Sequence, residues 1–176
     1  MQRRWRPTVK IPLDYVCVKS GVLCPRCQAL VDSGEVDERE VDVMKLLIEL
    51  EEKPEFRSLQ KAEYVKTYFI DNLAIIVLNF RDQQNIPVSR IGRELSAKLN
   101  KRIRIVNKSG DLKNMALQLV YPARILGINT LWLPDGTRQH IVRIPRYDVR
   151  RLPAEPQIIE HALTLITGKP VRIRLE

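Results

Sequence analysis

Two stretches of the chain repeat one pattern and decide the expected fold: SRIGRELSAKLNKRIRI at residues 89–105 and QIIEHALTLITGKPVRI at residues 157–173. In each stretch, apolar residues recur at the spacing of an amphipathic helix. A residue suited to a left-handed helix end, Asn100 or Gly168, then precedes a lysine and a short alternating strand. A helix–cap–strand unit that occurs twice predicts two small modules in tandem.

The sequence around the repeats supplies the other elements, and the predicted fold class is α+β. Residues 37–52 predict a helix, because Asp37 and Glu40 have the spacing of a capping box and apolar residues follow at helical intervals. Residues 63–70 and 73–80 predict strands, and the second is so apolar that it should be central in its sheet. The second module is expected to hold a helix over 112–120, strands over 123–133 and 138–144, and a short connection over 145–157.

The charge of the chain is uneven. Its net charge is +9, but residues 1–72 carry 12 basic and 13 acidic side chains, whereas residues 73–176 carry 18 and 8. A net charge of +10 over the second part predicts a polyanionic partner, since Lys and Arg neutralise phosphates; a solvated basic surface is the alternative. No apolar run approaches the roughly 20 residues of a membrane helix, and the basic start lacks the apolar core of a secretory signal. We therefore expect a cytoplasmic protein with no membrane partner.

All three cysteines fall within a loop-rich stretch at residues 14–36. Cys24-Pro25-Arg26-Cys27 places two thiols on one turn, and Cys17 lies seven residues earlier. Two thiolates on a tight turn are typical of tetrahedral zinc sites, so the predicted metal ligands are Cys17, Cys24 and Cys27. Asp14 or Asp32, a water, or a ligand from another molecule could complete a zinc site. A disulfide and free thiols are the alternatives.

One stretch carries a resemblance to a known family. MALQLVYPARI at residues 115–125, followed by Gly127 and Ile128, has a Pro-Ala pair that leaves a helix and enters a strand. It resembles the linker helix and first strand of the second KH domain in archaeal NusA-like proteins, and the likeness continues to Asp148. The resemblance implies two tandem KH domains of the second topological type, each a three-stranded sheet with helices on one face. It also implies an RNA-binding role in transcription elongation or termination.

The expected organisation follows from the repeat, the cysteines and this resemblance. It comprises a basic N-terminal arm over residues 1–13 that is disordered when free, a Cys module over 14–36, a first KH-like domain over 37–108 and a second over 109–176.

The chain departs from the family at the loop that grips nucleic acid. KH domains use a GXXG loop before the repeated helix, and the corresponding residues, Ile86–Ser89 and Ala154–Gln157, contain no glycine. Pro87 and Pro156 each remove an amide donor, and Glu155 adds a repulsive charge. We therefore expect this grip to be lost or weakened and binding to depend on basic side chains. The candidate RNA-binding residues are Arg90, Arg93, Lys98, Lys101, Arg102 and Arg104 in the first copy, and Arg143, Arg146, Arg150 and Arg151 in the second.

The second group of arginines is the stronger evidence for a polyanionic partner, because four arginines within nine residues repel one another without a counter-charge.

Two functions stay open at this point. One is a NusA-like RNA-binding protein; the other is a protein-interaction or assembly factor of the ribosome or RNA polymerase. An enzyme is not expected, because the chain has no phosphate-cradling glycine loop, nucleophile elbow or His-rich metal site.

Overall fold

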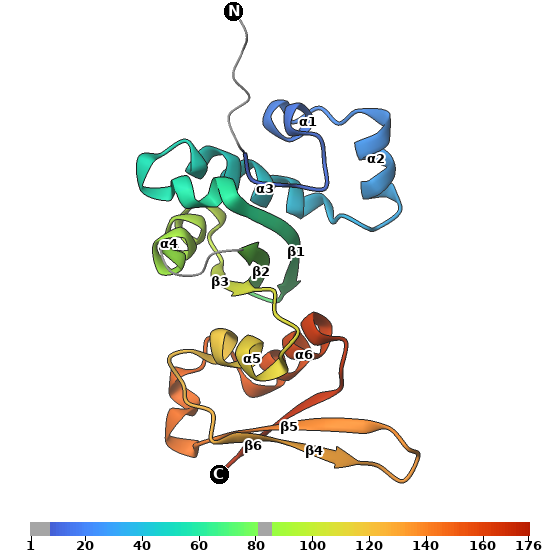
Figure 1. Ribbon diagram of the computed structural model, residues 1–176, viewed down its shortest axis with the longest axis vertical. Helices are drawn as coiled ribbons and strands as arrows, with labels where there is room; N and C mark the ends of the chain where they lie inside the picture. Colours follow the sequence, from blue (N-terminus) through green and yellow to red (C-terminus); the bar gives the residue numbers. More distant parts are fainter. Residues whose placement is uncertain (1–7, 81–85) are drawn as a thin grey trace, which may run out of the picture. The chain divides into compact units, whose positions relative to one another are not determined.

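The structure, a computed structural model, describes residues 8–80 and 86–176 and shows a mixed α+β fold with two three-stranded sheets (Figure 1). The first elements in chain order are α1 (Tyr15–Ser20), α2 (Pro25–Asp32), α3 (Glu38–Glu51), the 3₁₀ helix η1 (Pro54–Lys61), β1 (Ala62–Ile70) and β2 (Leu73–Phe80). They are followed by α4 (Val88–Leu99), β3 (Arg102–Asn107), α5 (Leu112–Val120), β4 (Gly127–Trp132), β5 (Arg138–Ile144), the 3₁₀ helix η2 (Arg146–Arg151), α6 (Pro156–Thr167) and β6 (Val171–Leu175). Among the described helices, none combines the length with the apolar composition that a membrane crossing demands.

The chain forms two compact units. The first spans Met1–Thr67 and Ile76–Ile103, and the second spans Tyr68–Ile75 and Arg104–Glu176. The domain ranges expected from the sequence stay predictions.

Helix α3 is the main helix of the first unit, and its predicted capping box is confirmed. The Asp37 side chain accepts a hydrogen bond from the Arg39 N–H at 2.9 Å, and Glu40 Oε1 accepts one from the Asp37 N–H at 3.1 Å. These bonds satisfy amide donors that the first turn of a helix leaves open. The helix then buries an apolar stripe that includes Met44, Leu47 and Ile48.

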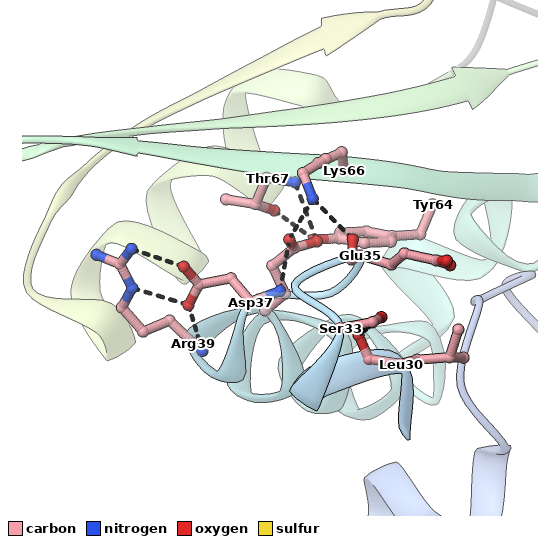
Figure 2. Close-up of polar contacts among 9 residues, drawn as sticks. Leu30, Ser33, Glu35, Asp37, Arg39, Tyr64, Lys66 and Thr67 are labelled. Atoms are coloured by element: carbon pink, nitrogen blue, oxygen red, sulfur yellow. Dashed lines mark hydrogen bonds and ion pairs between the residues drawn. The ribbon is translucent and has the colours of Figure 1, made fainter. Parts of the chain in front are cut away.

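A buried polar network joins α3 to β1 (Figure 2). Glu40 is only 1% exposed, yet its Oε2 accepts bonds from the Tyr64 hydroxyl at 2.6 Å and the Thr67 N–H at 3.3 Å. Lys66 Nζ lies 3.3 Å from Glu40 Oε1 and donates to the Glu35 carbonyl at 2.8 Å. Burial, together with the neighbouring Glu40, raises the pKa of Tyr64 and keeps it a neutral donor. A buried carboxylate with this many donors fixes the position of α3 on the strand.

The first sheet has the strand order β1-β2-β3, so the prediction of a central second strand is confirmed. All of β2 except Asn79 is buried, as expected for a strand with neighbours on both sides.

Both copies of the repeated helix–cap–strand unit are present. Helix α4 ends at Asn100 with φ 52°, and α6 ends at Gly168 with φ 66°, both in the left-handed region. Glycine and asparagine tolerate this conformation better than other residues, which is why they end the helices. Strands β3 and β6 follow, each an edge strand of its three-stranded sheet.

The second unit packs two helices on one side of its sheet (Figure 1). Strand β4 pairs antiparallel with β5, which pairs parallel with β6. Helices α5 and α6 bury Leu119, Ile159 and Leu163 against Val142 and Ile144 of β5, in a core cluster of 16 buried residues.

Four expectations are wrong in part. The stretch at 14–36 is not loop-rich, because it contains α1 and α2. Strand β4 begins at residue 127 instead of 123, since the Ala123 and Arg124 amides donate to the Val120 carbonyl and the Asp148 carboxylate instead of a strand. The expected connection over 145–157 includes η2.

The fourth concerns the N-terminal arm. Residues 8–13 are ordered within the first unit: Val9 and Leu13 are buried, and Lys10 exchanges backbone hydrogen bonds with Ala62 and Tyr64 at 3.0 and 2.8 Å. The rest of the predicted arm, residues 1–7, lies outside the described residues.

Candidate functional site

The three cysteines converge with Asp14 into one cluster. One ligand atom from each of Asp14, Cys17, Cys24 and Cys27 lies within 4.8 Å of all the others. Asp14 is the residue before α1 and Cys17 lies within that helix, while Cys24 precedes α2 and Cys27 lies in its first turn. The Cys-x-x-Cys turn therefore wraps the start of α2, and Pro25 at the first helical position favours that start.

Hydrogen bonds already orient the cluster. The Asp14 N–H donates to Cys27 Sγ at 3.2 Å, and the Cys24 N–H donates to Cys17 Sγ at 3.3 Å. Asp14 Oδ2 lies 3.3 Å from Cys24 Sγ and 3.6 Å from Cys27 Sγ. Amide donors stabilise a thiolate over a thiol, which favours metal binding.

The thiols of the Cys-x-x-Cys turn differ in acidity. Hydrogen bonding from Cys27, chiefly its backbone amide, lowers the pKa of Cys24. Burial raises the pKa of the fully buried Cys27 to about 11. A cation would reverse the effect of burial, because it stabilises the charged form of each ligand.

The residues fit a four-coordinate metal ion. Four ligands at about 2.3 Å from a tetrahedral centre lie about 3.8 Å from one another, so the cluster needs only a small contraction from its 4.8 Å limit. All three cysteines are free thiols in the structure. Of the two carboxylates considered from the sequence, Asp14 belongs to the cluster, whereas Asp32 lies outside it and accepts a bond from Gln28 at 2.9 Å.

The basic residues predicted in the first copy are spread over α4 and β3. Arg90, Arg93 and Lys98 are exposed on α4, and Lys98 pairs with Glu49 of α3 at 3.4 Å. Lys101 precedes β3, where Arg102 is exposed and Arg104 is half-buried. Loss of solvent lowers the pKa of Arg104.

The arginines predicted in the second copy lie on β5 and η2, and the expectation that they lack a counter-charge is wrong for Arg143 and Arg151. Arg143 pairs with Glu176 at 3.4 Å, and Arg151 lies 3.4 Å from Asp148 Oδ1. Asp148 is fully buried beside Arg151 and Arg124, so an acidic side chain lies within the arginine group itself. Arg146 and Arg150 are exposed.

Asp148 also joins η2 to the segment that leads into β4. Its Oδ2 accepts the Arg124 N–H at 3.0 Å and lies 3.9 Å from Arg124 Nε. Neither Arg124 nor Asp148 was among the site residues predicted from the sequence. Two exposed tyrosines lie close to this link in the sequence: Tyr147 directly precedes Asp148, and Tyr121 lies three residues before Arg124; they are 69% and 67% exposed. We call Tyr121, Arg124, Arg146, Tyr147, Arg150 and Arg151 the η2 patch.

No protein-family model matches the chain, and no curated protein matches it. Among solved structures, the chain is similar to one titled "Crystal structure of APE1850", with 19% sequence identity and a TM-score of 0.40. The alignment covers 59% of this chain and 80% of that one. A likeness at this level assigns neither a family nor an activity.

Proposed function

We propose that the protein binds RNA through two KH-like units and acts, like the NusA-like proteins that its sequence resembles, in transcription elongation or termination. The observation that carries the proposal is the repeated helix, left-handed cap and edge strand, found once in each three-stranded sheet. The excess of ten positive charges over residues 73–176 supports a polyanionic partner.

Basic side chains take the place of the missing glycine loops in this proposal. Pro87 is the residue before α4, and Pro156 is the first residue of α6, so both former loop positions lie directly at helix starts without a glycine. The η2 patch offers two kinds of group. Its arginines include Arg124 and Arg151, which contact the buried Asp148, and its two tyrosines are exposed. Arginine and aromatic side chains together are the groups that bind single-stranded RNA.

The test is recovery of RNA with the tagged full-length chain from its own cells, followed by sequencing. We expect enrichment of specific transcripts and a several-fold loss of RNA in the double variant Arg146→Gln/Arg150→Gln. The matched control is Lys45→Gln/Arg57→Gln, which removes two exposed charges from residues 1–72, where the net charge is −1. Equal RNA recovery from all three proteins would contradict the proposal.

A second candidate function is an assembly or interaction factor of the ribosome or RNA polymerase. The observation that favours it is that Lys98, Arg143 and Arg151 have carboxylate partners within the chain, together with the loss of both glycine loops. It predicts recovery of a large complex in which the association survives nuclease treatment, and no binding to naked RNA.

We also propose that Asp14, Cys17, Cys24 and Cys27 hold a structural zinc ion. Three thiolates and one carboxylate are donors that zinc accepts, and four protein ligands leave no open position for catalysis. Metal analysis of the purified chain should give one zinc per molecule. Asp14→Ala should weaken zinc retention against a chelator, Asp14→Cys should restore it, and Asp32→Ala should leave it unchanged. Metal-free protein with unchanged thermal stability would contradict this proposal.

A further inference from the structure

The tip of the β4–β5 hairpin carries an exposed tryptophan that neither the metal cluster nor the η2 patch uses. Figure 1 shows the hairpin continuing beyond the part of the sheet that α5 and α6 cover. In the antiparallel register, Val142 lies opposite Ile128, His140 opposite Thr130 and Arg138 opposite Trp132. Because side chains alternate along a strand, these three pairs share one face of the sheet. Val142 is fully buried, whereas Trp132 is 62% exposed, so the face leaves the core as it approaches the tip.

The two outer pairs are already held in place. The Arg138 guanidinium carbon lies 4.1 Å from the centre of the Trp132 ring, a cation–π contact. One step toward the core, Thr130 Oγ1 lies 3.3 Å from His140 Nδ1. Pairing of this kind across strands orders the side chains before any ligand arrives, which lowers the entropy lost on binding.

The chemistry of these pairs fits an unpaired base on a negatively charged strand. An indole with more than half of its surface in solvent offers a flat apolar ring on which a base can stack. Arg138 adds a positive charge beside the ring. His140 and Thr130 add polar groups two residues farther along each strand, on the same face. The one acidic residue of the hairpin, Asp135, has its Oδ1 engaged by the Thr137 N–H and hydroxyl at 2.9 and 2.6 Å.

We infer that the Trp132–Arg138 pair is a stacking site for an unpaired RNA base, with His140 and Thr130 contacting the adjoining nucleotide. This inference rests on the proposed RNA-binding function and adds a second contact to it. The pair and the η2 patch lie at opposite ends of β5, whose seven residues span roughly 20 Å. One single strand of several nucleotides reaches both.

The chain offers a direct reporter for this contact, because Trp5 and Trp132 are its two tryptophans. The full chain with Trp5→Phe therefore fluoresces from Trp132 alone. We expect a short oligoadenylate to quench this fluorescence, and the same oligonucleotide made with abasic sugars to bind without quenching. Trp132→Leu should weaken oligoadenylate binding by about 5- to 150-fold, the range for loss of one stacked base. Trp132→Phe should recover part of the affinity, and abasic binding should be equal in all variants.

The outcomes separate this inference from the function on which it rests. If oligoadenylate binds to Trp132→Leu with normal affinity, and does not quench Trp132 fluorescence in the Trp5→Phe protein, the stacking site is overturned while RNA binding stands. If neither oligonucleotide binds at low salt, both are overturned. If Trp132→Leu instead abolishes association with a protein and leaves oligoadenylate affinity unchanged, the hairpin is a protein-docking site and the inference is wrong. Because Trp132 is largely exposed, its replacement should not unfold the unit, which circular dichroism checks.

Discussion

The cysteine-bearing segment and the second unit are held together by different means. In residues 14–36 the buried residues are Cys17, Val18, Cys27 and Val36, so half of them belong to the cluster of Asp14 and the three cysteines. The second unit instead has a cluster of 16 buried residues, most of them on α5, α6, β5 and β6. A segment with so few buried apolar residues would gain order from the ion proposed above, whereas a unit with its own core does not depend on one.

The largest effect expected from this difference is that of metal removal. Structural zinc contributes about 10 kcal/mol or more to small sites of this kind, so chelation should unfold α1 and α2 and leave the second unit folded. Amide hydrogen exchange should show loss of protection over residues 15–32 and unchanged protection in β5. Cys24→Ser should behave like the chelated protein, and Ser33→Ala, in the same segment, should not. Protection that survives chelation would show that the segment holds itself together.

The second unit should respond most strongly to a loss of core volume. Leu163 of α6 is fully buried, and replacing it by Ala should lower the free energy of unfolding by about 2–5 kcal/mol. Leu165, two residues later on the same helix, is 42% exposed, so Leu165→Ala should change it by less than about 0.5 kcal/mol. Urea denaturation measures both, and equal effects would mean that α6 does not face the core as described.

The left-handed helix ends allow a finer test of the repeat. Gly168 has open space where a Cβ would lie, so Gly168→Ala should cost only the backbone penalty, about 1–2 kcal/mol. Gly168→Asn should cost less, because Asn100 occupies the same position in the other copy. Gly110 also has open space but no positive φ, so Gly110→Ala is the control and should not destabilise the protein. Equal loss in Gly168→Ala and Gly168→Asn would show that the two caps are not equivalent.

The smallest effect concerns the start of α3, on which the cysteine segment packs. Hydrogen bonds from the Arg39 side chain lower the pKa of Asp37 to about 2, from an ordinary 3.8. Because the folded-state pKa is lowered, the stabilisation is present above about pH 3.8 and is lost as the pH falls toward about 2. Asp37→Asn keeps a capping side chain but removes this dependence. Acid titrations of the two proteins that run in parallel over this window would contradict the assignment.

Much of the fold could be predicted because its signals are local. The capping box at Asp37, the apolar strand at 73–80 and the helix ends at Asn100 and Gly168 each depend on neighbours in the sequence. The start of β4 could not be predicted, because it depends on Asp148, which takes the Arg124 amide from 24 residues away.

The cysteine cluster could also be predicted from local signals, whereas the surroundings of the arginines and of Trp132 could not. The Cys-x-x-Cys turn pointed to the cluster, and Asp14, three residues before Cys17, has the spacing that places both at one helix start. The expectation that the arginines of the second copy lack a counter-charge failed because the sequence shows Asp148 only as one acidic residue among four arginines. Its burial beside two arginines is visible only in the folded structure. Trp132 gave no signal, since a tryptophan in a strand is usually a core residue.

The most direct test of the central claim is the salt dependence of single-stranded RNA binding by the full, metal-loaded chain. We predict binding at about 50 mM salt that weakens steeply on a double-logarithmic plot, by about 0.7 in slope for each phosphate contact. Arg146→Gln/Arg150→Gln should therefore reduce the slope by about 1.4. Absence of binding at low salt, or an affinity that salt does not change, would contradict the claim that the second unit binds RNA through its arginines.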